Sequence, residues 1–160
     1  MIQALSYLDT WALSLVLWKN KSLFEAGEGP VRFVALGSHL KLKEWQPLKA
    51  VVARGLNALT PVGKERPTLA SIGIEKLLPK GHTEWVQDAE FAVDHNRFHL
   101  PIITNPGAFF YCGTAMVNML PGILSYVDVG QWCSAVNNGD HPRYHLIVDI
   151  HKAPEVEVKE

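Results

Sequence analysis

The sequence has few cysteines, little net charge and no long uninterrupted apolar run. Two cysteines, Cys112 and Cys133, are too few for the disulfide framework of a small secreted domain, and they suit a reducing compartment. A net charge of −1 gives no broad basic surface for nucleic acid or anionic lipid. The apolar stretch 2–18 is interrupted by Asp9, is too short to span a bilayer and lacks the basic leader of a signal peptide. These features predict a soluble cytoplasmic protein with neither nucleic acid nor membrane as partner.

The bulk composition is that of one globular domain. The chain has 160 residues, of which 48% are apolar and 19% charged. That length is sufficient to bury a core. We expect a single domain over 1–160, with a helix-rich N-terminal part (1–65) packed on a core of strands (66–152).

The N-terminal part shows helical spacing in two places. In the first segment, apolar residues recur three and four positions apart, at Leu5, Leu8, Ala12, Leu15 and Val16, with Trp11 and Trp18 extending the same face. A second helix is predicted over 47–59, between two prolines. The segments 31–36 and 68–78 are predicted to be strands.

From residue 97 onward the sequence alternates between short strands and turn signals. The turns are predicted at 105–107, 121–122 and 137–140, where Asn, Pro and Gly cluster. Strands rich in β-branched and aromatic residues are predicted at 97–104, 114–120, 123–129 and 143–151. This pattern favours a sandwich or small barrel with helices on its outside or at one end.

Two of these strands begin alike, with Arg97-Phe98-His99-Leu100 and Arg143-Tyr144-His145-Leu146. Because alternate residues of a strand share a face, each strand has one apolar face and one polar face that starts Arg-x-His. Asp149 shares the polar face of the second strand. That face meets either solvent, as on a one-sided sheet, or a polar cavity. Two guanidinium groups in one cavity would suit a dicarboxylate.

The stretch 97–149 resembles the aspartyl/asparaginyl β-hydroxylase domain. The resemblance rests on the strand Arg97-Phe98-His99-Leu100, the hairpin from Pro121-Gly122 to Asp128, the turn over 134–140 and the last strand over 143–149. It extends less closely back to about Leu69.

The resemblance implies a mostly β fold with flanking helices, a double-stranded β-helix or jelly roll. It also implies that Fe(II) and 2-oxoglutarate lie inside the barrel and that the side chain of a protein or amino acid is hydroxylated. By position, Arg143 would bind the distal carboxylate of 2-oxoglutarate. Arg97 and His99 would contact the same cosubstrate, with His145 beside Arg143.

The family's two iron-binding histidines have no histidine counterpart here. Family spacing places the first at Asp88 or, one residue earlier, Gln87, and the second at Cys133 or, in another register, Ser134. Asp88 and Cys133 could each bind a metal. Three histidines near the relevant loops are alternative ligands: His82, His95 and His141. Of these, His82 could approach from the turn at Gly81.

Three interpretations follow. The chain is a hydroxylase acting on a peptide or amino-acid side chain, or a non-catalytic relative that serves as a binding or structural module for a protein partner. The third is an unrelated jelly roll, such as a cupin-like or virion structural protein. The sequence specifies neither the substrate nor the oligomeric state.

Overall fold

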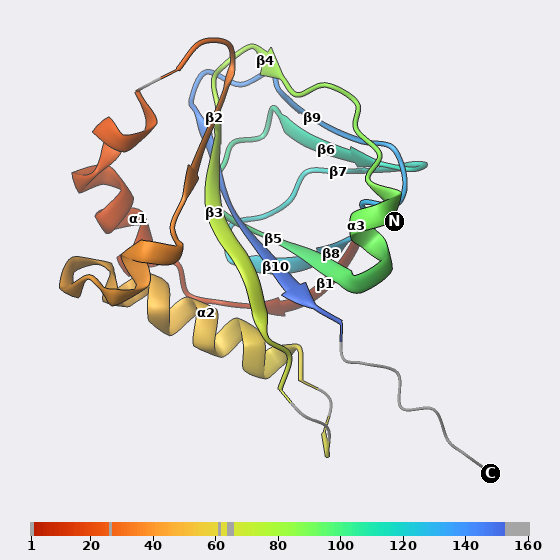
Figure 1. Ribbon diagram of the computed structural model, residues 1–160. Coiled ribbons are helices and arrows are strands. Elements are labelled where there is room, and N and C mark those ends of the chain that lie inside the picture. Colours follow the sequence, from red (N-terminus) through yellow and green to blue (C-terminus); the bar gives the residue numbers. More distant parts are fainter. Residues whose placement is uncertain (1, 26, 61, 64–65, 153–160) are drawn as a thin grey trace.

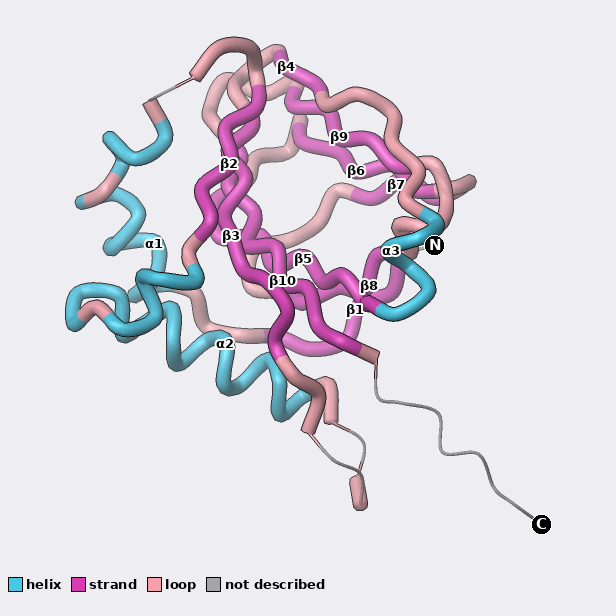
Figure 2. The backbone as a smooth tube through the Cα atoms, in the orientation of Figure 1, coloured by secondary structure: helices cyan, strands magenta, loops and turns pink. Residues whose placement is uncertain are grey.

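The computed structural model describes residues 2–25, 27–60, 62–63 and 66–152. The described strands form a six-stranded sheet of order β1-β8-β5-β10-β3-β2 and a four-stranded sheet of order β4-β9-β6-β7, and neighbouring strands are antiparallel. Their bounds are β1 (Ile2–Tyr7), β2 (Val31–Ala35), β3 (Leu69–Leu77), β4 (Gly81–His82), β5 (His95–Ile103), β6 (Ala108–Cys112), β7 (Ala115–Val117), β8 (Ile123–Val127), β9 (Cys133–Asn137) and β10 (Arg143–His151). The two sheets face each other around a barrel interior (Figure 2).

The connections between the sheets make the fold a jelly roll. From β3 to β10 the chain winds between the sheets, so that β3, β10, β5 and β8 lie side by side in one, and β4, β9, β6 and β7 in the other. The expected double-stranded β-helix is therefore confirmed. The N-terminal part contributes strands as well as helices, because β1 and β2 form the two edges of the larger sheet.

Helices cover the outside of the larger sheet (Figure 1). The α-helices are α1 (Trp11–Lys19), α2 (Gln46–Ala58) and the short α3 (Ala89–Asp94), and 3-10 turns occupy Lys21–Phe24, Gly37–Lys41 and Lys43–Trp45. Within the described residues, none of the helices combines the length and the apolar character that crossing a membrane requires. α3 lies away from α1 and α2, between β4 and β5.

Two apolar cores lie on opposite faces of the larger sheet. The outer core packs α1 and α2 against it and includes the fully buried Trp45 and Leu48 together with Phe98 and Leu146. The inner core lies between the sheets and is smaller, with Leu77 and Phe110 among its members. The expected apolar faces of 97–104 and 143–151 thus face the helices, and the two Arg-x-His faces turn toward the barrel interior.

The first segment differs from its expectation. Residues Ile2–Tyr7 form β1, which pairs antiparallel with β8, and the helix begins only at Trp11. The buried side of α1 is Leu13, Val16 and Leu17, whereas Trp11 and Trp18 are 71% and 69% exposed. Of the predicted face, Leu8 and Val16 are buried and Leu5 and Leu15 are exposed. The prediction of one continuous helix was wrong because an apolar spacing of three and four also fits a strand followed by a helix.

The strands of the C-terminal half agree with the sequence in most places. The predicted strand 143–151 matches β10, and β3, β5, β7 and β8 lie within the predicted ranges to within two residues. Three strands were missed, one of them the two-residue β4. Residues 108–112 form β6, and 133–137 form β9 although 134–137 were assigned to a turn. The turn follows β9, and Asn137 itself is buried in the strand.

Gly122 occupies a position that permits no side chain. Its φ is +79°, and an added Cβ would lie 2.6 Å from the Leu8 carbonyl oxygen. We expect Gly122→Ala to lower the free energy of unfolding by about 2–4 kcal/mol, through backbone strain and the clash together. Urea denaturation followed by circular dichroism measures this loss.

Gly63 supplies the matched control, since it has the same φ of +79° with nothing within 4 Å of an added Cβ. Gly63→Ala therefore tests backbone strain alone, about 1–2 kcal/mol. Equal losses in the two variants would show that the approach of Leu8 to Gly122 has no energetic consequence.

Candidate functional site

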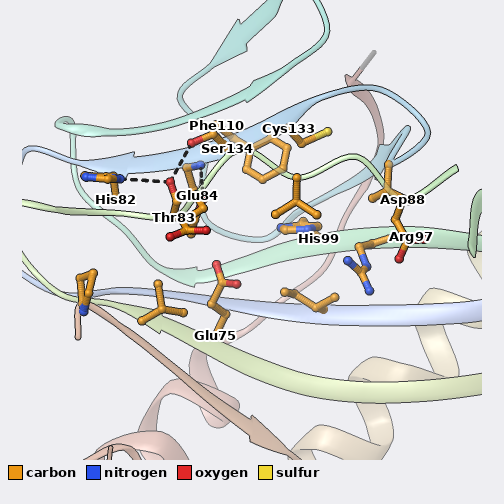
Figure 3. A pocket seen from close by; sticks show the side chains of 16 residues that line it. Glu75, His82, Thr83, Glu84, Asp88, Arg97, His99, Phe110, Cys133 and Ser134 are labelled. Carbon is orange, nitrogen blue, oxygen red and sulfur yellow. Dashed lines mark hydrogen bonds between the residues drawn. The ribbon is translucent and has the colours of Figure 1, made fainter. Parts of the chain in front are cut away.

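A pocket of about 520 Å³ opens between the two sheets. Glu75 of β3 and Arg97 and His99 of β5 contribute from the larger sheet, and Phe110 and Cys133 from the smaller one. Figure 3 shows these side chains converging on the space between the sheets. The polar face of β5 therefore borders a cavity rather than bulk solvent, whereas Arg143, His145 and Asp149 of β10 are buried outside the pocket lining.

The two histidines of the Arg-x-His strands meet inside the barrel. His99 and His145 are 4% and 2% exposed, and their Nδ1 atoms lie 3.1 Å apart, so that one ring donates its Nδ1–H to the other. Burial lowers the pKa of both imidazoles well below the usual value, and the positive charge of Arg143 lowers it further. Both rings are therefore neutral at pH 7, and the pair offers hydrogen bonds without charge.

Arg143 is the most deeply buried charge of the site. It is 1% exposed, and its Nη2 donates a hydrogen bond to Glu75 Oε1. Burial lowers the pKa of the guanidinium, while the charge of Glu75 and this hydrogen bond raise it. The Nε and Nη1 atoms are buried and have no hydrogen-bond partner among the described residues. The guanidinium thus keeps capacity for a further acceptor.

Arg97 is held by a different carboxylate. Its Nε and Nη2 donate to the two oxygens of Asp149, at 2.8 and 3.1 Å. Asp149 also accepts a hydrogen bond from the Ser71 hydroxyl, at 2.8 Å. The Arg97 guanidinium lies over the ring of Phe91 in α3, 4.9 Å from its centroid. These contacts fix Arg97 at the pocket wall with its carboxylate-binding edge occupied.

The two arginines pair with different carboxylates. Arg97 pairs with Asp149, its cross-strand neighbour, and Arg143 lies six residues earlier on β10. At about 3.3 Å per residue this separates their attachment points by roughly 20 Å. That separation is one between backbone positions, whereas the charges of both guanidinium groups lie close enough to His99 to lower its pKa. Binding of one dicarboxylate by the two guanidinium groups therefore stays a prediction.

The residue at the position expected for the first iron histidine, Asp88, caps a helix. Asp88 borders the pocket, and its carboxylate accepts the Phe91 N–H at 3.2 Å, which stabilises the start of α3. The alternative, Gln87, does not line the pocket, and its side chain donates to the Gly130 carbonyl. Only Asp88 of these two is placed to touch a ligand.

The residue at the position expected for the second iron histidine, Cys133, lies in a disulfide. Cys133 pairs with Cys112, its cross-strand neighbour on β6, with Cα atoms 4.1 Å apart. The sequence predicted no disulfide framework, and this single bridge forms because adjacent strands bring the two cysteines together. A disulfide sulfur is not the thiolate that binds a metal. The hydroxyl of Ser134, the other register, donates to the Thr83 carbonyl.

The alternative histidines do not complete a metal site. His82 lines the pocket, and its Nδ1 lies 3.1 Å from the Thr83 carbonyl oxygen. His95 stacks on Phe91 outside the pocket lining, and His141 is also absent from that lining. In the described residues, no three His, Cys, Asp or Glu side chains are grouped so as to hold a metal ion. This donor set does not fit an iron(II) centre of the imidazole and carboxylate type.

The same fold occurs in several non-haem oxygenases of known structure. The model has a TM-score of 0.65 with the nickel complex of the non-haem monooxygenase ThoJ, at 13% identity over 93% of this chain and 72% of that one. It scores 0.64 with the viral collagen prolyl hydroxylase of Paramecium bursaria Chlorella virus-1 in complex with 2-oxoglutarate, at 8% identity over 95% and 96%. It also scores 0.64 with the α-ketoglutarate-dependent epimerase SnoN from nogalamycin biosynthesis, at 16% identity over 91% and 76%. At these identities the likeness shows the fold alone.

The family follows from the sequence itself. The model of the aspartyl/asparaginyl β-hydroxylase family matches residues 10–153. The chain therefore belongs to this family, as the motifs at Arg97 and Arg143 indicated. No curated protein sequence matches the chain.

Glu75 is the site residue that sequence reasoning missed. It stands on β3 directly opposite His145 of β10. The signal was a single acid between Ile74 and Lys76, on the same strand face as the buried Leu77. An acid facing inward from a strand needs a cation, and Arg143 is on the neighbouring strand.

Proposed function

We propose that this chain is a ligand-binding member of the hydroxylase family that does not carry out iron-dependent hydroxylation. The observation that supports this is the state of the two iron positions. Asp88 caps a helix and Cys133 lies in a disulfide, yet both border the pocket. Without imidazole at either position, iron(II) would lack the ligands that hold it for reaction with oxygen.

The pocket itself supports a binding role. Its volume of about 520 Å³ falls in the range that holds a small organic molecule or one side chain of a peptide. Its walls combine apolar groups such as Phe110 and Ile147 with hydrogen-bonding groups such as His99 and Thr83. We propose as ligand a small molecule or a peptide side chain, presented by a protein partner in the second case.

Anaerobic titration with iron(II) and 2-oxoglutarate, followed by visible absorbance, tests this proposal. We expect no charge-transfer band from the parent chain, with circular dichroism showing that it is folded. As the positive control, a double variant with Asp88→His and Cys133→His restores both imidazoles, and we expect it to bind iron(II) more tightly. A band from the parent chain would overturn the proposal, and an unchanged double variant would show that these are not the ligand positions.

Iron- and 2-oxoglutarate-dependent hydroxylation of a protein or amino-acid side chain is the second candidate. Family membership and the two unpartnered nitrogens of the Arg143 guanidinium favour it. Under this candidate, His82 and Asp88, which line the same pocket, would be the first ligands to replace. The same titration decides between the two candidates, because only a hydroxylase would give the band.

A further inference from the structure

Glu75 stands between the pocket and Arg143. The Glu75 side chain is 18% exposed and lines the pocket, whereas the Arg143 side chain is 2% exposed and does not. In Figure 3 the Glu75 carboxylate points from the larger sheet into the space between the sheets. A molecule that enters the pocket therefore meets a carboxylate first and the guanidinium only behind it.

The ion pair with Glu75 uses only part of the hydrogen-bonding capacity of the Arg143 guanidinium. One nitrogen, Nη2, donates to Glu75, and Nε and Nη1 have no partner in the described part of the chain. Buried donors without acceptors are costly, and a guanidinium edge fits a carboxylate through two parallel hydrogen bonds. This guanidinium therefore has the buried setting and the free donors of an anion site, while a side chain of the same protein supplies the anion.

The remaining charges of the pocket do not attract an anion either. Glu84 and Asp88 line it together with Glu75, and the lining arginine, Arg97, is already paired with Asp149 through two hydrogen bonds. His99 is buried and neutral. A free carboxylate in this pocket would lie near other negative charges, and Glu75 would separate it from the Arg143 guanidinium.

We propose that Glu75 is a built-in carboxylate that occupies the anion site of Arg143 and so decides which ligands the pocket accepts. With Glu75 in place the pocket rejects dicarboxylates such as 2-oxoglutarate and admits neutral or basic ligands. Removal of Glu75 exposes the guanidinium and converts the pocket into a carboxylate site. This proposal rests on the proposed binding function and names the class of its ligand.

The test is calorimetric titration of the parent chain and Glu75→Ala with 2-oxoglutarate and with glutarate, at constant ionic strength. The parent is expected to show no saturable binding at millimolar concentrations. Glu75→Ala is expected to bind both acids at least about 10- to 100-fold more tightly, as charge-assisted hydrogen bonds to Arg143 form. Glu84→Ala is the matched control, since it also removes one pocket carboxylate. Its affinity for both acids is expected to equal that of the parent.

A second substitution tests whether the gain in affinity depends on Arg143. Adding Arg143→Met to Glu75→Ala is expected to abolish the new binding, because the buried cation is gone. If Glu75→Ala does not fold alone, glutarate is expected to restore its circular dichroism spectrum. Glu75→Gln keeps the volume and an acceptor for Arg143 without the charge, and it is expected to bind glutarate more tightly than the parent.

Three results would overturn the inference. They are binding of glutarate by the parent as tight as by Glu75→Ala, an equal gain in Glu84→Ala, or no gain in either Glu75 variant. None of them concerns iron, since all titrations are made without metal. Failure of the proposed function is recognised separately, by a charge-transfer band from the parent chain with iron(II).

Discussion

Arg143→Ala is expected to lower the free energy of unfolding by about 3–5 kcal/mol, the usual cost of leaving one member of a buried ion pair alone. Arg143 is 1% exposed, and the Glu75 carboxylate that it contacts has a side chain only 18% exposed. Without the guanidinium, that carboxylate either stays charged with little water or takes up a proton. Urea denaturation measures the loss.

The ion pair need not contribute net stability as a whole. Replacing both members, Arg143→Met with Glu75→Leu, is expected to restore most of the loss, since apolar groups of similar volume often match a buried pair. Arg54, an exposed residue of α2, provides the control for the loss of one positive charge. If Arg143→Ala were no less stable than Arg54→Ala, the Arg143–Glu75 contact would have no energetic role.

Acid is expected to destabilise the protein steeply below about pH 6.5. His99 and His145 have folded-state pKa values well below 6.5 because they are buried near Arg143. Above pH 6.5 both are neutral in the folded and unfolded chains and contribute no pH dependence. Below it the unfolded chain binds two protons that the folded chain does not, so stability falls by up to about 2.7 kcal/mol per pH unit until the folded-state pKa values are reached.

Urea denaturation at a series of pH values from about 7.5 downward measures this slope, which follows from the difference in bound protons. His145→Gln keeps a polar group beside His99 and removes one of the two protons. Its slope is therefore expected to be smaller by about 1.4 kcal/mol per pH unit. An identical slope in the parent and in His145→Gln would show that His145 is not held neutral in the folded state.

Periodicity predicted the faces of the two central strands. Arg143 and His145 alternate with Tyr144 and Leu146, and a strand can place such a pattern in only one way once its apolar face is buried. The same rule located His99. The succession of short strands and turns indicated a sandwich or small barrel, and the resemblance to the hydroxylase family specified the jelly roll.

The sequence-based predictions failed where the structure of a segment depends on residues that are distant in the sequence but close in space. Residues 2–7 are a strand because β8 offers them an edge, and no local pattern contains that edge. Trp11 and Trp18 are large and apolar, but α1 buries Leu13 and Leu17 instead. The Arg143–Glu75 pair joins residues 68 apart in the sequence. The alternation of residues could identify the inward face, but not which of its charges pair.

β10 is the last described strand, yet it lies in the middle of the larger sheet, between β5 and β3. Three pairs of the site require it: Arg143 joins a partner 68 residues away, Arg97 one 52 residues away and His99 one 46 residues away. Contacts of such long range make folding slow. During synthesis, a chain that has emerged only to residue 142 holds β3 and β5 without the strand that joins them. The edges of β3 and β5 that β10 will pair with are then unpaired and exposed to water. The growing chain is therefore most prone to aggregate just before β10 completes the pocket.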